Sequence, residues 1–201
     1  MPCSLAHERA LWRQGIERVA GIDEAGRGPL AGPVVVAAVI LTKRFKLREL
    51  DDSKKLNAQK REALYAQLST TVEWSVSIFA HDAVDRLNIL RATHEAMKEA
   101  FSKLPSAAHA LIDGLPVPNF PAPQTALVGG DGLSFSIAAA SVIAKVTRDR
   151  IMEEMDAMYP EYGFRQHKGY ATPKHLGKLR EHGPCPIHRK SFEPVAQRYL
   201  F

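Results

Sequence analysis

The sequence predicts an α/β fold: a mixed β-sheet flanked by helices, followed by a small helical, loop-rich C-terminal appendage. Short β-branched runs come early, with one helical segment among them, and helices then alternate with short strands. After Pro160 the composition shifts to Gly, Pro, His and basic residues. We therefore expect residues 1–160 to form the core, with 1–16 as an N-terminal extension, and residues 161–201 to form the appendage.

The elements of the first half are marked by β-branched residues and turn signals. Residues 18–23 and 34–41 are short and β-branched, and the Gly- and Pro-rich stretch between them predicts a hairpin. Residues 57–68 predict a helix that Asn57 caps. The alternating residues 71–79 predict a third strand.

The second half alternates between helices and short strands. Apolar residues at helical spacing predict one uninterrupted helix over residues 82–104, which Pro105 ends. Residues 109–112 and 125–128 are short apolar runs that end near glycine, so they are strand candidates. The alanine-rich residues 135–158 predict a long helix.

The appendage contains one clearly delimited helix. Thr172 is placed as its N-cap, Pro173 as its first helical residue and Gly183 just past its end. The rest of this segment is rich in turn-forming residues, which predicts loops around that helix.

The composition is that of a globular protein with an excess of basic residues. The chain has 201 residues, of which 45% are hydrophobic and 24% charged, and a formal net charge of +5. This balance favours acidic partners, nucleic acid first among them. Neither Cys3 nor Cys185 belongs to a C-x-x-C pair, so no zinc site or disulfide framework is indicated.

No segment of the sequence indicates a membrane or a secretory route. The longest apolar run, Val34–Leu41, is far shorter than the roughly 20 residues of a membrane helix. Charged residues interrupt the N-terminus where a signal peptide would be apolar. We expect a cytoplasmic protein without membrane contacts and, because no interface signal stands out, a monomer.

Carboxylates follow three short apolar runs, each beside glycine. They are Asp23 with Glu24, then Asp113, then Asp131. Strand ends on one side of an α/β sheet are where such proteins build their sites, so the acids converge if these strands are neighbours. Two of the acids also have a structural interpretation, since Asp113 suits a turn and Asp131, like Ser134, could cap a helix.

The adjacent acids Asp23 and Glu24 are harder to explain by structure alone. At the end of an apolar strand they cost desolvation free energy unless they face water or a cation. Successive strand side chains point to opposite faces, so both reach one centre only if the strand ends or bends there. Gly26 and Gly28 permit such a bend.

Carboxylates without a nearby Cys or His cluster are typical of a hard-cation site. Oxygen ligands favour Mg²⁺ or Mn²⁺ over zinc, and either one or two ions would suit this set. With a phosphate substrate, such a site indicates metal-assisted hydrolysis, in which Lys and Arg hold the nucleic-acid backbone.

A dinucleotide-binding loop is the competing interpretation of the glycines. Gly26, Gly28 and Gly32 follow a strand as that fingerprint requires, but a helix must come next. Here Pro29 and Pro33 intervene and a strand follows, so the context fails. The sequence also contains no G-x-x-x-x-G-K-[ST] phosphate loop.

Six motifs follow one another from residue 21 to about residue 195. They are GIDEAGRGPLAGPVVVAAVIL, DDSKKL, IDG, GGDGLSFSIAAASVIAKVTRDR, YPEYGFRQHKGYAT and GPCPIHRKSF. In this order they resemble the motifs of ribonuclease HII. The resemblance implies an RNase H-like core with a helical C-terminal part. It also implies cleavage of the RNA strand of RNA–DNA hybrids, and incision 5′ of a single ribonucleotide in duplex DNA, leaving 3′-OH and 5′-phosphate ends.

The resemblance also assigns roles to residues. The family's four metal-binding acids fall on the strand-end carboxylates, Asp23, Glu24, Asp113 and Asp131. Its Gly-Arg-Gly element, which reads the ribose 2′-OH largely through backbone groups, falls on Gly26, Arg27 and Gly28. Glycine suits this role because it lets the backbone approach the ligand closely.

Further substrate contacts are implied by the later motifs. The family's tyrosine at the ribose–DNA junction falls on Tyr170, with Tyr162 as a rival, and many members carry Gly where Ala171 stands. Ser53 and Lys54 are expected to hold a phosphate near the site.

Other basic residues have two interpretations. Arg189, in the C-terminal motif, either contacts DNA or packs with Phe192 in a structural role. Lys145 and Arg148 are expected to form helix ion pairs with nearby acids.

The last residues form a separate candidate motif. Gln197, Leu200 and Phe201 resemble a Q-x-x-L-F peptide that binds a sliding clamp, in which two apolar side chains dock in the partner. The alternative is a helix end folded onto the domain, or a terminus without a fixed structure.

Two other functions remain open at this point. One is an RNase H-fold nuclease restricted to long hybrids. The other is a non-catalytic module that binds hybrids, against which the four acids argue, since carboxylates repel phosphate unless a cation lies between them.

Overall fold

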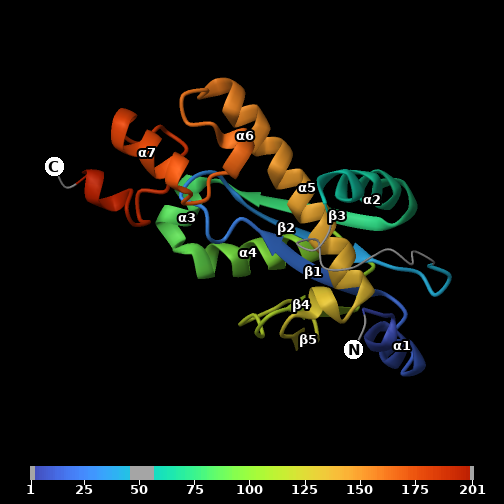
Figure 1. Ribbon diagram of the computed structural model, residues 1–201. Helices are drawn as coiled ribbons and strands as arrows, with labels where there is room; N and C mark the ends of the chain where they lie inside the picture. Colours follow the sequence, from blue (N-terminus) through green and yellow to red (C-terminus); the bar gives the residue numbers. More distant parts are fainter. Residues whose placement is uncertain (1–2, 46–56, 200–201) are drawn as a thin grey trace.

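The computed structural model describes residues 3–45 and 57–199, and a mixed five-stranded sheet lies at its centre (Figure 1). The strands are β1 (Val19–Ala25), β2 (Val34–Ile40), β3 (Glu73–Phe79), β4 (His109–Asp113) and β5 (Gln124–Leu127), in the order β3-β2-β1-β4-β5. The pairs β1–β2 and β2–β3 are antiparallel, and the pairs β1–β4 and β4–β5 are parallel. The predicted mixed sheet and the hairpin of its first two strands are confirmed.

Helices cover both faces of the sheet. On one face lie α2 (Ala58–Thr71) and α5 (Phe135–Met158), and on the other lies α4 (Ile89–Ser102). Side chains alternate along a strand, so β2 contributes to both cores. It sends Val35, Ala37 and Val39 to the first and Val36, Ala38 and Ile40 to the second. This two-sided burial explains why β2 is apolar throughout.

The prediction of a single helix over residues 82–104 is wrong, because the structure has two helices there, α3 (His81–Leu87) and α4. Asn88 between them has a φ of 64°, and its side chain accepts a hydrogen bond from the Arg91 amide. Asn is among the residues found most often at positive φ and is a strong N-cap, so the first helix ends here and a second one starts. Leu90, one of the apolar residues at the predicted helical spacing, is 52% exposed.

The remaining elements are short. They are α1 (Ala6–Arg13), η1 (Gly130–Gly132), α6 (Phe164–His167), α7 (Pro173–His182) and η2 (Ala196–Tyr199). The sequence predicted the ends of α7 correctly, since the Thr172 side chain accepts a hydrogen bond from the His175 amide and Gly183 has a φ of 75°. It predicted α1 only as an extension.

The chain after residue 160 packs against the loop that joins β1 to β2. The Leu30 amide donates to the Gly169 carbonyl at 2.8 Å, and the Arg189 amide donates to the Leu30 carbonyl at 2.8 Å. Figure 1 shows α6 and α7, in orange and red, beyond the end of the sheet that lies away from α1. No helix within the described ranges is long and apolar enough to cross a bilayer.

Candidate active site

Two neighbouring parallel strands end in the acids that the sequence singled out. In the β1–β4 pair Ile22 lies opposite Ile112, so the next residues, Asp23 and Asp113, come at the same edge of the sheet. Beside β4, β5 leads into η1, which carries Asp131. Three separate segments thus deliver carboxylates to one edge, as the strand-end pattern predicted.

Asp23 is a buried carboxylate among other carboxylates. It is 3% exposed and accepts hydrogen bonds from the Glu24 amide, at 2.7 Å, and from the Ser141 side chain. Burial, followed by the charges of Glu24 and Asp113, raises the pKa of Asp23 well above its ordinary value. The protein therefore holds a carboxylate where its negative charge is unfavourable unless a cation is bound.

The bend expected at the adjacent acids lies slightly further along the chain. Strand β1 keeps its register with β2 through Ala25, and the chain turns at Gly26, which has a φ of 99°. Asp23 and Glu24 nevertheless serve one region. The Ser141 side chain, which binds Asp23, also lines the cavity that Glu24 lines.

Asp113 and Asp131 are joined through one backbone contact. The Gly130 amide donates to Asp113 Oδ1 at 2.6 Å, so the turn that carries Asp131 is attached to the end of β4. Asp131 is 7% exposed. It does not cap the following helix, because Ser134 is the N-cap of α5 and accepts a hydrogen bond from the Ile137 amide.

The acids gather without forming a closed ligand set. Over residues 3–45 and 57–199, no three His, Cys, Asp or Glu side chains form a group that could hold a metal ion as they are placed. The donor chemistry nevertheless fits a hard divalent cation, since the charged donors are carboxylates. A bound cation would also cancel the repulsion that Glu24 and Asp113 impose on Asp23.

A cavity of about 180 Å³ lies beside these acids. Its lining comes from the end of β1, the following loop, α5 and the appendage: Glu24, Ala25, Gly26, Arg27, Gly28, Ser141, Lys145 and Tyr170. The sequence did not single out Ser141 as a site residue. Ser141 lies four residues before Lys145 on α5, so the two share one face of the helix, and this spacing was the signal that the sequence offered.

The two glycines of the Gly-Arg-Gly element have different reasons to be glycine. A Cβ at Gly26 would overlap the Arg148 side chain, and its positive φ also disfavours other residues. A Cβ at Gly28 would meet only Tyr170 Cε1, at 3.7 Å, which is ordinary contact. Internal packing therefore does not require glycine at position 28, where its small size instead leaves the backbone open to a ligand.

Two buried arginines donate hydrogen bonds to the carbonyls of the loop between β1 and β2. Arg148 is 1% exposed and donates to the carbonyls of Pro33, Ala31 and Lys168 at 2.9 to 3.1 Å. Arg189 is 0% exposed. It donates to four loop carbonyls, those of Gly26, Arg27, Pro29 and Gly32, at 2.6 to 3.0 Å. Burial lowers the pKa of Arg148 to about 10 and that of Arg189 to about 9, so both stay charged at neutral pH.

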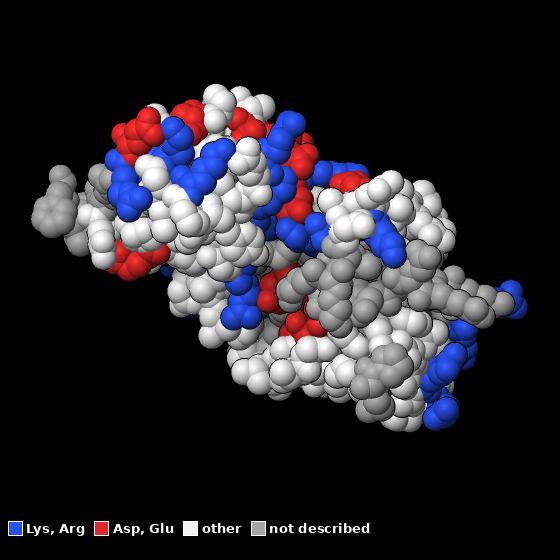
Figure 2. Space-filling view, viewed as in Figure 1, with Lys and Arg blue, Asp and Glu red and all other residues white. Residues whose placement is uncertain are grey.

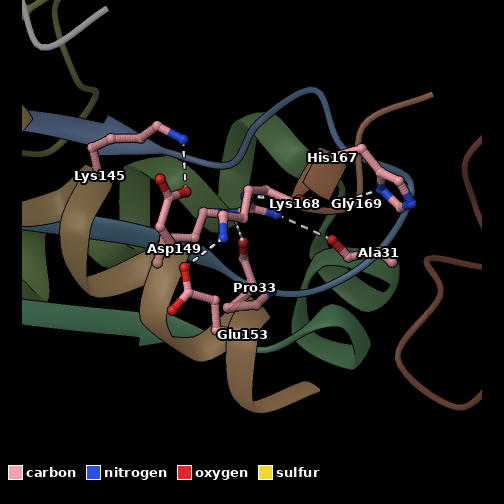
Figure 3. Close-up of polar contacts among 9 residues, drawn as sticks. Ala31, Pro33, Lys145, Asp149, Glu153, His167, Lys168 and Gly169 are labelled. Carbon is pink, nitrogen blue, oxygen red and sulfur yellow. Dashed lines mark hydrogen bonds and ion pairs between the residues drawn. The ribbon is translucent and has the colours of Figure 1, made fainter. Parts of the chain in front are cut away.

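These contacts correct two expectations. Arg189 has no exposed surface with which to contact DNA, so the structural interpretation holds, and it also packs over the Phe192 ring. Arg148 binds carbonyls instead of forming the expected helix ion pair. The ion pair expected for Lys145 is confirmed at 2.6 Å from Asp149 and is drawn in Figure 3.

The two candidate tyrosines occupy contrasting positions. Tyr170 is 44% exposed and lies beside Gly28 in the cavity lining. Tyr162 is 2% exposed, stacks on Phe164, and donates its hydroxyl to the Gly183 carbonyl. Only Tyr170 is therefore placed to meet a ligand.

The other residues predicted to contact the substrate or a partner are Ser53, Lys54, Arg27 and those of the terminal motif. Ser53 and Lys54 lie outside the described residues, as do Leu200 and Phe201 of the terminal motif. Arg27 is described, and its Nη1 lies 3.4 Å from Glu24 Oε1, with half of its side chain exposed. Figure 2 shows acidic groups near the centre of this face, with basic groups to their left and above them. Basic side chains next to the acids suit the phosphates of a nucleic-acid backbone.

Comparison with known proteins agrees with this arrangement. The family model for ribonuclease HII matches residues 20–195. Ribonuclease HII of Geobacillus kaustophilus (strain HTA426) is 53% identical over 195 residues, which cover 96% of this chain and 75% of that protein. Ribonuclease HII of Acholeplasma laidlawii (strain PG-8A) is 50% identical over 196 residues, or 96% of each chain.

A solved structure agrees in fold. A chain of the PCNA:RNase HII complex from Archaeoglobus fulgidus is similar with a TM-score of 0.77 and 28% identity, over 88% of this chain and 95% of that one. The predicted RNase H-like fold is therefore confirmed. Because the family model spans most of the chain and curated relatives share about half of its residues, the chain belongs to the ribonuclease HII family.

Proposed function

We propose that this endoribonuclease, which hydrolyses the RNA strand of RNA–DNA hybrids, also incises duplex DNA on the 5′ side of a single embedded ribonucleotide. We further propose that it requires Mg²⁺ or Mn²⁺. The observation that carries the proposal is the open backbone of Gly28 between the strand-end carboxylates and Tyr170. A ribose 2′-OH distinguishes RNA from DNA, and a backbone free of side chain is suited to meet it.

We assign separate roles to the acids, the glycines, the arginines and the tyrosine of the site. Asp23, Glu24, Asp113 and Asp131 would hold the cation, which supplies activation of water and stabilisation of the leaving oxygen. Gly28 and its neighbours bind the ribose, and Arg148 and Arg189 keep that loop in shape. Tyr170, which lines the cavity beside Gly28, would stack at the junction between the ribonucleotide and DNA. Residues 161–201, which supply this tyrosine, are the proposed substrate-binding part beside the core of residues 1–160.

One assay tests both parts of the proposal. A labelled DNA duplex with one ribonucleotide is compared with a long RNA–DNA hybrid and an all-DNA duplex, each with Mg²⁺, Mn²⁺ or a chelator. We expect a single cut 5′ of the ribonucleotide, with 3′-OH and 5′-phosphate ends, that the chelator abolishes. Cleavage of the long hybrid alone would favour the restricted nuclease, and binding without product would favour the non-catalytic module.

Tyr170→Ala sharpens the same assay. Because the Tyr170 ring lies beside Gly28, its loss should slow incision at a single ribonucleotide by about tenfold. Cleavage of long hybrids should slow less. Tyr170→Phe keeps the ring and is the matched control. Equal losses on both substrates would contradict a role in reading the junction.

We also infer that the C-terminal segment Gln197–Phe201 binds a sliding clamp. The support is its Q-x-x-L-F pattern and the existence of a clamp complex for the Archaeoglobus fulgidus relative. Deletion of residues 197–201 should abolish binding to a purified clamp while hybrid cleavage without the clamp is kept. Unchanged clamp binding would remove this proposal.

A further inference from the structure

The N-terminal segment lies across the turn that carries Asp131. Ser4 forms an isolated parallel bridge with Ser134. In this bridge the Ser4 amide donates to the Leu133 carbonyl at 3.2 Å, and the Ser4 carbonyl accepts from the Phe135 amide at 3.1 Å. The Cys3 thiol also lies 3.7 Å from the Asp131 carbonyl. Residues at the start of the chain are thus hydrogen-bonded to the backbone of this acid and of the residues that follow it.

Glu8 on α1 forms the strongest part of this attachment. It is 0% exposed, and its Oε1 accepts from the Ser134 hydroxyl at 2.6 Å, the Ser136 amide at 2.9 Å and the Ser136 hydroxyl at 2.7 Å. These donors form the first turn of α5, where the helix dipole also favours a carboxylate. Within the described part of the chain, its Oε2 is buried without a hydrogen-bond partner. Removing this carboxylate would leave the three buried donors of Ser134 and Ser136 without their acceptor, and unpaired buried donors are costly.

α1 itself is anchored on either side of Glu8. Leu5 packs in the core cluster that contains Ala138 of α5, and Leu11 packs with Val19 and Ile137 in another. The helix therefore cannot shift without disturbing two hydrophobic clusters, so Glu8 is a fixed point for the groups that bind it.

The turn is closed by backbone hydrogen bonds from the amides of residues 132–134 to the carbonyls of Gly129 and Gly130, but its glycines contribute no side chains to hold it in place. Gly129, Gly130 and Gly132 surround Asp131, and Cβ atoms added at Gly129 or Gly132 would meet nothing within 4 Å. Glycine-rich backbone has many accessible conformations, so contacts from outside the turn add to its own hydrogen bonds in selecting one. On one side the contact is Asp113, which binds the Gly130 amide, and on the other it is the N-terminal segment.

We propose that Glu8 is a positioning residue that holds Asp131 in register with Asp113 and thereby sets the protein's affinity for its divalent cation. The inference rests on the proposed function, since it takes Asp131 as a metal ligand. Glu8 lies outside the residues 20–195 that the family model matches. Groups that orient a ligating carboxylate typically change metal affinity by about 10–100-fold when they are removed.

The test compares Glu8→Ala with Glu8→Gln, which keeps an accepting oxygen for the three donors. Hybrid cleavage is measured against Mg²⁺ concentration, and Mn²⁺ binding is measured directly by calorimetry. We expect Glu8→Ala to raise the half-maximal Mg²⁺ concentration and the Mn²⁺ dissociation constant about tenfold, with KM for the hybrid unchanged. Glu8→Gln should stay within about threefold of the original protein.

A measurement on the metal-free protein separates positioning from activity. Hydrogen exchange of the amides of residues 130–134 should be faster in Glu8→Ala, because the turn loses its outer support. Val84→Ala, which removes buried volume in a separate cluster on α3, controls for lost stability and should leave the Mg²⁺ dependence unchanged. Glu17→Gln, on the surface beside Lys43, controls for lost charge.

The outcomes distinguish this inference from the function on which it rests. A folded Glu8→Ala protein with unaltered Mg²⁺ dependence and unaltered exchange would overturn the positioning role. Full activity of Asp131→Asn would instead overturn the metal-ligand assignment itself. If Glu8→Ala does not fold, Ser136→Ala removes one of the three hydrogen bonds and should shift the Mg²⁺ dependence in the same direction, by about twofold, with no shift counting against the proposal.

Discussion

At the residue scale, the ionised side chain of Asp23 suits a cation site but lowers the stability of the metal-free protein. A carboxylate that is buried beside Glu24 and Asp113 has a raised pKa, so its ionised form is disfavoured in the folded protein. The folded state then binds more protons than the unfolded state above the ordinary pKa of Asp, and stability falls as the pH rises through this range. Such strain is expected where the missing partner is a cation.

Asp23→Asn should therefore raise the melting temperature of the metal-free protein at pH 8 while hybrid cleavage falls by about a hundredfold or more. Asn keeps an oxygen for the Glu24 amide and the Ser141 side chain, so the local structure survives. Asp113→Asn is the companion variant, since its oxygen can still accept from the Gly130 amide. A destabilised Asp23→Asn protein, or an active one at ordinary Mg²⁺ concentrations, would contradict this account.

At the scale of elements, the loop between β1 and β2 is shaped by two buried cations that form no ion pair with the carboxylates of residues 3–45 and 57–199. Arg148 and Arg189 direct their donors to backbone carbonyls of residues 26–33, so loop shape depends on charge-assisted hydrogen bonds to the main chain. Loss of either guanidinium would leave several buried carbonyls unpaired. The loop is therefore organised before a ligand arrives, which lowers the cost of binding.

The glycines of this loop provide a matched pair of variants. Gly28→Ala should change the free energy of unfolding by no more than about 0.5 kcal/mol, because the added Cβ meets only ordinary contact, yet it should impair cleavage. Gly26→Ala should cost about 1–3 kcal/mol, because its positive φ and the Arg148 side chain both oppose a Cβ. Urea unfolding and hybrid cleavage measure the two effects. Normal cleavage by Gly28→Ala would remove the argument for close backbone contact with the ribose.

At the scale of the whole molecule, local signals predicted the frame of the fold and the position of the acids. Strand alternation, the caps at Asn57 and Thr172, and carboxylates beside glycine are all local in sequence, so they could be predicted. The break at Asn88 could not, because neither glycine nor proline marks it. The partners of Glu8 and Arg189 could not either, since they lie 126 and about 160 residues away and only the folded chain reveals them.

Two neutral histidines of the appendage, His175 and His188, form a hydrogen-bonded series that ends at the Tyr170 carbonyl. His175 Nδ1 must donate to the Tyr170 carbonyl at 2.9 Å, so in the neutral ring its Nε2 accepts from His188 Nε2, at 3.0 Å. His188 Nδ1 then accepts from the Cys185 amide at 3.0 Å. Protonation of either ring would set two N–H groups against each other. Burial accordingly lowers the pKa of both His175 and His188 to about 4.

This network predicts acid sensitivity of the whole fold. Between about pH 6.5 and pH 4 the unfolded histidines bind protons that the folded ones do not, so stability should fall as the pH falls through this window. The slope is about 1.4 kcal/mol per pH unit for each proton involved. Urea unfolding at several pH values should show a shallower slope for His188→Gln than for the original protein, whereas His7→Gln, on α1 outside the network, should keep the original slope. Equal slopes for all three proteins would show that other groups control the acid response.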